Sequence, residues 1–304
     1  MRTPVARRRE ATLVWVVGLA LGCGRVSEEV VDAEQPPTDA LGEDTHVDAS
    51  GPPGPWQPPV PIASVNTSNS DRTPWLSADG LTLYFSSNHP VGKTHDIRRA
   101  VRSSIAQPFQ AAVSVTALNT TWTEEAPFVA ASGKRIWFSR TVATGTQILV
   151  ATGSSGVWNE PSLVAEVSTS TVDGMAMVQT DGSSMYLMSR RGANGDADIY
   201  VSTWSATVEQ WLAPTTTGLG KVNSPALDLH PHVSSDGLRL YLTSSRDGMH
   251  GIYVAARATP DDDFGTPAPI SELNTVPIDG GFWISDDERH MILGRGGDLH
   301  ETRR

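Results

Sequence analysis

Five acidic residues recur at matching positions along the chain and are its strongest candidates for chemistry. Each lies eight residues before a turn position, such as Asp79-Gly80 or Asp236-Gly237. The five acids are Asp71, Glu124, Asp173, Asp228 and Asp279. Because each would begin the innermost strand of its repeat, we expect the five carboxylates to gather around one mouth of a central channel. Carboxylates that close repel one another unless a cation or a basic group compensates them.

Two hypotheses explain how this acid ring is compensated. In the first, the ring binds a ligand: a divalent cation such as calcium, or the basic group of a partner. In the second, the acids are scaffold, because arginines follow the second strand of four repeats, with Asn88 in the first repeat. These arginines are Arg140, Arg190, Arg246 and Arg295. Guanidinium groups form bidentate ion pairs with carboxylates, so they could hold the ring together. The two roles are compatible, and no further cofactor is expected.

The fourth acid, Asp228, is followed by two histidines in the order Asp228-x-His230-x-His232. Alternation along a strand puts the three side chains on one face, and His-x-His is a workable spacing for a metal. The other repeats fill the position of His232 with apolar residues, namely Trp75, Phe128, Met177 and Trp283. Apolar residues at this position are typical of packing between neighbouring repeats. The pattern therefore favours a buried His232 over a metal ligand.

Catalysis has little support in the sequence. The chain lacks the Gly-x-Ser-x-Gly nucleophile motif. Glycosidases use two carboxylates about 5–9 Å apart, one as acid and one as base or nucleophile. Here the acids occupy equivalent repeat positions, whereas a glycosidase would need a specialised pair. A non-catalytic binding or scaffolding protein is the leading hypothesis, and a carbohydrate-active enzyme using two of the ring acids is the alternative.

The elements that must position these residues come from a repeat of about fifty residues. An aromatic residue followed by an extended stretch recurs at steps of 53, 49, 53 and 53 residues. The five aromatics are Trp56, Phe109, Trp158, Trp211 and Phe264. The turn after each acid favours a hairpin, since Gly supplies the positive φ of a tight turn. The strands after these turns are apolar on both faces, as expected between packed sheets: Leu83–Ser86, Ile136–Ser139, Met185–Ser189, Leu240–Thr243 and Met291–Leu293.

Four short strands per repeat, without helical periodicity, predict an all-β protein: a β-propeller of five blades with four antiparallel strands each. The motif Pro74-Trp-Leu-Ser-Ala-Asp-Gly80, followed by Tyr-Phe-Ser-Ser and Asp-Ile, resembles the TolB-like, WD-repeat-like propellers. The resemblance covers 56–304. It implies the fold and little of the function, because such propellers serve as binding platforms, as parts of peptidases and as enzymes. The stretch after Trp56 should close the last blade as its outermost strand and remove an open edge.

The N-terminal segment is typical of export. Arg2, Arg7, Arg8 and Arg9 precede an apolar run of about twelve residues, which is too short to span a bilayer. The run ends at Cys23, the single cysteine, in a sequence that resembles the lipobox of bacterial lipoproteins. We therefore predict a signal peptide over 1–22, a lipidated Cys23 and an acidic, Pro-rich tether over 23–55. The alternative is an ordinary signal peptide with an incidental cysteine.

Charge limits the partners. The net charge is −11, and the chain has no stripe of lysine and arginine. Phosphate binding depends on clustered basic residues, so nucleic acid is not an expected partner. We expect a protein or a glycan of the bacterial cell envelope as partner, and contact with the membrane only through the lipid anchor. The predicted location is the outer membrane, facing the periplasm or the exterior.

Overall fold

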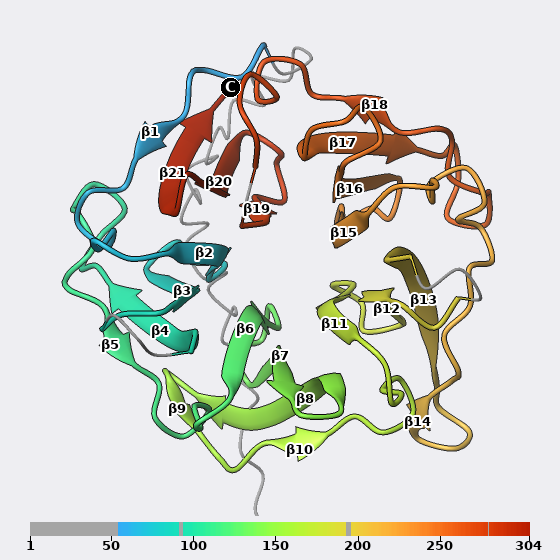
Figure 1. The fold of residues 1–304 in the computed structure, drawn as a ribbon, viewed down its shortest axis with the longest axis horizontal. Coiled ribbons are helices and arrows are strands. Elements are labelled where there is room, and N and C mark those ends of the chain that lie inside the picture. Colours follow the sequence, from blue (N-terminus) through green and yellow to red (C-terminus); the bar gives the residue numbers. More distant parts are fainter. Residues whose placement is uncertain (1–53, 91–93, 193–195, 279) are drawn as a thin grey trace, which may run out of the picture. The chain divides into compact units, whose positions relative to one another are not determined.

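A computed structural model describes residues 54–90, 94–192, 196–278 and 280–304. The predicted signal peptide, Cys23, nearly all of the tether and Asp279 lie outside these residues. The described part forms five antiparallel sheets around a central axis, as Figure 1 shows. This is the five-bladed propeller that the repeat predicts. Among the described residues no helix is long and apolar enough to cross a bilayer.

Each blade contributes four strands from the axis outward. The innermost strands are β2 (Asp71–Leu76), β6 (Thr123–Val129), β11 (Asp173–Val178), β15 (Asp228–Val233) and β19 (Phe282–Ile284). The second strands are β3 (Thr82–Ser87), β7 (Arg135–Val142), β12 (Ser184–Ser189), β16 (Arg239–Ser244) and β20 (His290–Arg295). The third strands are β4 (Asp96–Val101), β8 (Gly145–Ser154), β13 (Asp198–Ser205), β17 (Gly251–Ala256) and β21 (Asp298–Arg303). The outermost strands are β5 (Val113–Ser114), β10 (Ser162–Leu163), β14 (Gln210–Trp211), β18 (Ala268–Pro269) and β1 (Val60–Pro61). A further short strand, β9 (Val157–Trp158), pairs with β8.

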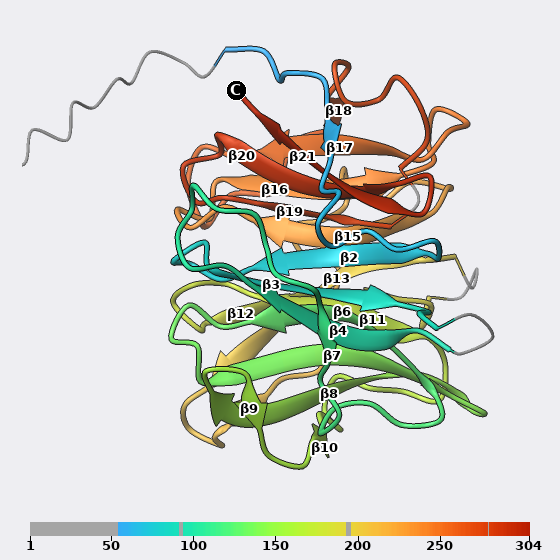
Figure 2. The same cartoon turned by 90° about the vertical axis from the view of Figure 1, so that its left-hand side faces the viewer.

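We number the blades in chain order, so that β2–β5 form blade 1 and β19–β21 with β1 form blade 5. Blade 5 joins the two ends of the described chain. Val60 pairs with Glu301 and Pro61 with His300, and Gln57 N donates to Arg303 O at 2.9 Å. The predicted closure by the N-terminal strand is therefore confirmed, and β21 has no open edge there. Figure 2 shows the ring from the side, with β2, β3 and β4 facing the viewer.

The core lies between neighbouring blades. In β3 three successive side chains, Leu83, Tyr84 and Phe85, are all buried, although alternation points them to opposite faces of the sheet. The second strands of the other blades are buried in the same way. Each sheet is covered on both faces by the next blade, which is why these segments are continuously apolar in the sequence.

Four innermost strands, β2, β6, β11 and β15, bend two residues after the ring acid. The register shifts there, and the residue takes a left-handed φ of about 50°. The four non-glycine positions are Thr73, Ala126, Met175 and His230. In blade 5 the same position is Gly281, with φ 68°. Left-handed φ is uncommon for residues with a Cβ, so its recurrence in four blades marks a built-in bulge. These four residues line the narrow central part of the channel.

Candidate binding site

The structure places the four described ring acids inside the blades. Asp71, Glu124, Asp173 and Asp228 have no exposed surface. Each carboxylate accepts hydrogen bonds from both the backbone N–H and the hydroxyl of a residue four positions earlier, namely Thr67, Thr120, Thr169 and Ser224. The sequence-based expectation that they open onto the channel mouth differs from this arrangement, because the preceding loop folds back over each carboxylate.

Three of these acids also pair with arginines. Arg140 Nε lies 2.7 Å from Glu124 Oε1 and Arg246 Nη2 2.7 Å from Asp228 Oδ1. In blade 3 the partner of Asp173 is Arg191, at 2.8 Å, which corrects the predicted Arg190 by one residue. The three guanidinium groups also donate to the carbonyls of Leu118, Val167 and Val222. Arg295 donates to the matching carbonyl of Leu273 in blade 5.

The reason for the shift to Arg191 is a serine at the end of the second strand. Arg191 N and Nε both donate to Ser189 Oγ, which turns the guanidinium back toward Asp173. Arg246 uses Ser244 Oγ in the same way. Burial alone raises the pKa of Asp173, but hydrogen bonds from Ser189, Thr169 and Arg191 outweigh it and lower that pKa below its usual value. These contacts stabilise the charged carboxylate within the blade.

Blade 1 departs from this pattern. His89 occupies the position of Arg191 and Arg246, since its N–H donates to Ser87 Oγ at 3.2 Å. Its ring Nδ1 lies 2.9 Å from Asn69 Nδ2. Asn88, the residue matched to the arginines in the sequence, accepts from Ser70 N. Among the described residues, Asp71 Oδ1 has no hydrogen-bond partner although it is buried.

The two histidines of blade 4 lie on the channel. His230 Nδ1 is 2.9 Å from Thr243 Oγ1, and among the described residues its buried Nε2 has no partner. His232 packs between the rings of Trp75, at 5.5 Å, and Phe282, at 6.3 Å. Burial, with a contribution from His250 and Arg72, lowers the pKa of His230 to about 3, and burial lowers that of His232 to about 4. Within the described ranges no three His, Cys, Asp or Glu side chains are grouped to hold a metal ion.

A second polar cluster lies at the acid end of the innermost strands. Arg72 Nε is 3.1 Å from Glu125 Oε1 and 2.9 Å from His95 Nε2. Burial raises the pKa of Glu125 although Arg72 opposes it, and burial together with Arg72 lowers the pKa of His95 to about 4. These three residues carry no repeated signal in the sequence, because they occupy positions that differ in residue type from blade to blade.

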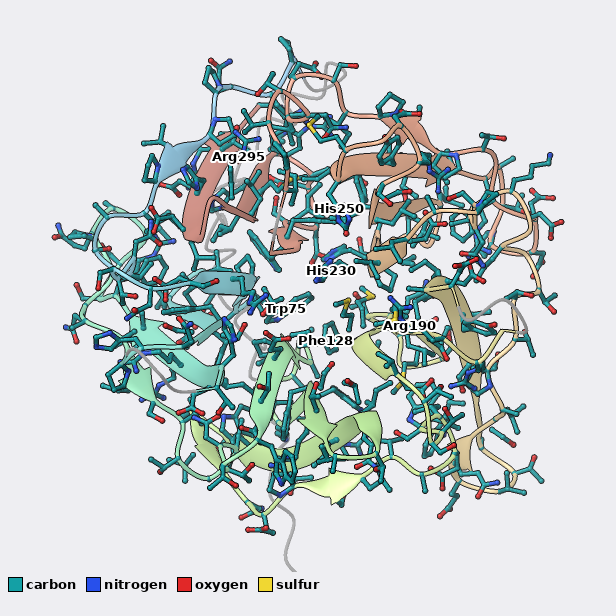
Figure 3. The ribbon with its side chains drawn as sticks, in the orientation of Figure 1. Trp75, Phe128, Arg190, His230, His250 and Arg295 are labelled. Atoms are coloured by element: carbon teal, nitrogen blue, oxygen red, sulfur yellow. The ribbon has the colours of Figure 1, made fainter. Side chains whose placement is uncertain are left out.

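The channel is closed midway by packed side chains. The Trp75 ring lies 4.4 Å from that of Phe128 and 5.5 Å from that of His232, so it crosses the channel between blades 2 and 4. Figure 3 shows Trp75, Phe128 and His230 pointing toward the centre. We call Trp75, Phe128 and His232 the plug. On the side of the plug that faces His230 and the ring acids, which we call the upper channel, the cavity measures about 40 Å³. This cavity therefore has room for a molecule of about the size of water and not for a larger ligand.

On the other side of the plug the channel widens into a funnel of about 930 Å³. Its walls include the hairpin turns that end the innermost strands of blades 1, 2, 3 and 5, so it opens at the end opposite to the ring acids. Its floor is largely aromatic: Trp75, Phe128, Trp137, Met177, His232 and Trp283. One wall carries Trp204 and Trp211, and the charged residues are Lys134, Arg135, Asp181, Asp286 and Asp287. Apolar walls with a few polar groups are typical of ligand sites.

In the sequence the funnel floor is recognisable only as a packing position, because four apolar residues and His232 at equivalent places are typical of a core. A better signal was present in Trp204. It is 39% exposed, and it breaks the repeat at a position where three blades have arginine. Departures from a repeat, more than its constant positions, indicate the surface that a binding protein uses.

The sequence matches no protein-family model and no curated protein. The fold is similar to that of an α-L-arabinofuranosidase from Podospora anserina in complex with cellotriose, with a TM-score of 0.55 and 12% identity over 83% of this chain and 96% of that one. A thermostable family-43 glycoside hydrolase gives 0.50 and 13%, over 78% and 89%. TolB from Acinetobacter baumannii gives 0.49 and 13%, over 78% and 55%. At such low identity these similarities show the propeller fold alone.

Proposed function

We propose that this protein is a non-catalytic binding propeller of the bacterial cell envelope, with its ligand in the funnel. The observation that carries the proposal is the cavity of about 930 Å³ with an aromatic floor and charged residues at its walls. Aromatic side chains give large contact area, and a few convergent polar groups give orientation. The ligand is a protein segment or a glycan, the two classes of partner that an envelope propeller meets.

The ring acids act as scaffold in this proposal. The four described acids have no exposed surface, and none of them lines the funnel or the upper channel. A glycosidase needs two carboxylates that reach a glycosidic bond from opposite sides of a cleft. Solved neighbours of similar fold include glycosidases, so hydrolysis of aryl glycosides is the direct assay of the alternative. Turnover that is lost in Asp173→Asn or Asp228→Asn, with folding retained, would contradict the proposal.

The funnel is tested by filling it. Ala131 is exposed and lines the funnel, so Ala131→Trp should block ligand entry without disturbing the core. Ala111 is also exposed and does not line the funnel, so Ala111→Trp is the matched control. Purified proteins are immobilised and exposed to a detergent extract of bacterial envelope, and the captured material is analysed for protein and glycan. The parent and the control should capture the same material and the blocked variant should not; equal capture by all three contradicts the funnel site.

We also propose that Cys23 is lipidated and anchors the propeller to the membrane through the tether of residues 23–55. The support is the signal-peptide pattern that ends at the single cysteine. Stable anchoring follows because covalent lipid chains add membrane affinity for every buried methylene. Cys23→Ala should move the protein from the membrane fraction to the soluble fraction of cells. Retention of the variant in the membrane fraction would contradict the anchor and leave the funnel proposal untouched.

A further inference from the structure

Each blade places one residue beside its inner hairpin turn, at the end of the third strand or directly after it. We call this the turn-facing position. Its backbone N–H donates to a carbonyl of the turn in every blade, namely to Leu81, Lys134, Ser183, Leu238 and Arg289. The five residues at the turn-facing position are Arg102, Gly153, Trp204, Arg257 and Arg304. Since the hydrogen bonds match, the five side chains start from equivalent places and can be compared directly.

In blades 1, 4 and 5 the turn-facing residue is an arginine that closes the turn. Its guanidinium lies 4.3–4.5 Å above the aromatic ring of the outer stretch, in the pairs Arg102–Phe109, Arg257–Phe264 and Arg304–Trp56. Its Nε donates at 2.7 Å to a carbonyl of the turn, that of Gly80, Gly237 or Glu288. An aromatic face and a carbonyl oxygen thus form a guanidinium site three times in this chain.

Blade 2 lacks both the side chain and the space. Gly153 has no side chain, and a Cβ built on it would lie 2.8 Å from a ring carbon of Trp158. The backbone itself therefore covers the aromatic residue of that blade. This leaves blade 3 as the blade in which the site could be open.

In blade 3 the turn-facing residue is Trp204. Its ring meets Trp211 edge-on at 5.3 Å, and 39% of the residue is exposed. At Gly80 and Gly237 a guanidinium nitrogen lies 3.5 Å from the place of a Cβ, whereas at Gly182, the matching glycine, no atom lies within 4 Å. The space beside this turn, which a guanidinium nitrogen approaches in blades 1 and 4, is therefore open within 4 Å of Gly182 in blade 3. Trp204, Trp211 and Gly182 all line the funnel.

A carboxylate stands beside this open volume. Asp181 is exposed, lines the funnel and accepts from Ser183 N at 2.8 Å, and Ser183 O accepts from Trp204 N. In blades 1, 4 and 5 the matching aspartate also accepts a serine hydroxyl, but blade 3 has Gln179 at that serine's position. The Asp181 carboxylate therefore keeps accepting capacity for a ligand.

We propose that this wall of the funnel binds an arginine side chain of a partner protein. The guanidinium lies over the exposed ring of Trp204, donates to the Gly182 carbonyl and pairs with Asp181. It thus makes the bond to the turn that the chain's own arginine makes in blades 1, 4 and 5, and it stacks on Trp204 because the outer ring of blade 3, Trp211, is already in contact with Trp204. The inference rests on the proposed function, in which the funnel is the binding site. It selects protein over glycan as the ligand class.

The test uses two peptides and two charge-matched variants. An acetylated, amidated tetra-arginine peptide and its neutral tetra-citrulline counterpart are titrated against the full propeller by calorimetry. Trp204→Arg refills the site with the chain's own guanidinium, as in the other blades. Trp122 is 44% exposed and precedes β6 at the acid end, so Trp122→Arg adds the same charge away from the funnel. Asp181→Asn removes the carboxylate alone.

The parent and Trp122→Arg should bind the arginine peptide equally, and the citrulline peptide about tenfold more weakly or not at all. Trp204→Arg should lose at least tenfold in affinity for the arginine peptide, and Asp181→Asn should lose severalfold. Equal binding of both peptides, or equal losses in Trp204→Arg and Trp122→Arg, would overturn the proposal.

Failure of the arginine site can be separated from failure of the funnel. Capture of envelope material that Ala131→Trp abolishes but Trp204→Arg leaves unchanged would reject the arginine site and keep the funnel. A captured neutral glycan would give that result. Loss of capture in both variants, together with binding of the arginine peptide, supports both proposals.

Discussion

Blades 1 and 4 share a fold to the level of single hydrogen bonds, yet they differ at the acid. In blade 4 Asp228 accepts from Ser224 and pairs with Arg246 at 2.7 Å. In blade 1 Asp71 accepts from Thr67 in the same way, but His89 stands where Arg246 would be and Oδ1 has no partner among the described residues. The hydrogen bonds from the preceding loop are thus enough to hold the acid in place, and the arginine adds further stability.

The largest expected difference is between the same substitution in the two blades. Asp228→Asn leaves the Arg246 guanidinium without its charge partner in a buried site, which destabilises by about 3–5 kcal/mol. For a domain of this size that lowers Tm by roughly 10 °C. In Asp71→Asn the amide can keep the Thr67 bonds through its oxygen and places its nitrogen where no donor points, so Tm should change by no more than a few degrees. The measurement is the Tm of both variants and of the parent. An equal fall in Tm in the two variants would show that Arg246 adds nothing to the stability of the fold.

The next difference concerns the equivalent positions of β2 and β15 that close the channel, where blade 4 has His232 and blade 1 has Trp75. The pKa of His232 is lowered by burial to about 4, against 6.5 in the unfolded chain. Between these values the unfolded state binds a proton that the folded state does not, so the stabilisation present above pH 6.5 is lost as pH falls toward 4.

His232→Phe, which copies Phe128 of blade 2, should reduce this dependence by about 1.4 kcal/mol per pH unit between pH 6 and 4. The measurement is chemical unfolding of parent and variant at several pH values in that range. Parallel curves for the two proteins would mean that His232 is protonated equally in the folded and unfolded states, and that its environment is wetter than the packing against Trp75 implies.

The sequence predicted the fold well and the site poorly, for one physical reason. Hairpin turns, apolar strands and the closing stretch after Trp56 are set by local patterns that recur five times, so errors in one copy are corrected by the others. Side-chain partners depend on which of two adjacent residues points toward the acid. Arg191, and not Arg190, reaches Asp173, because Arg191 donates to Ser189 Oγ and this bond turns its guanidinium toward the acid. The burial of the acids escaped prediction too, since it depends on the loop containing Thr67 and its equivalents.

A smaller effect is expected from giving blade 1 the arginine that it lacks. His89→Arg should place a guanidinium where Arg191 and Arg246 lie in blades 3 and 4. From there it can donate to Asp71 Oδ1, as those arginines donate to Asp173 and Asp228. A hydrogen bond to a buried charge outweighs the lost contact with Asn69, so stability should rise by about 1 kcal/mol. Asn88→Arg adds the same charge one residue away, in the register of Arg190, and should not stabilise. Equal melting of the two variants would contradict the equivalence of His89 with Arg246.

The smallest expected effect separates scaffold from cation site at Asp71. Calcium takes six to eight oxygen ligands, and the described residues offer no group of three acids or histidines at any one place. Added calcium should therefore leave the Tm of both the parent and Asp71→Asn unchanged relative to chelator. A ligand that binds only the folded state raises Tm by mass action. If calcium raised the Tm of the parent and not that of Asp71→Asn, the unpaired Oδ1 would be part of a cation site. The acid ring would then be scaffold in blades 2 to 4 and a ligand site in blade 1.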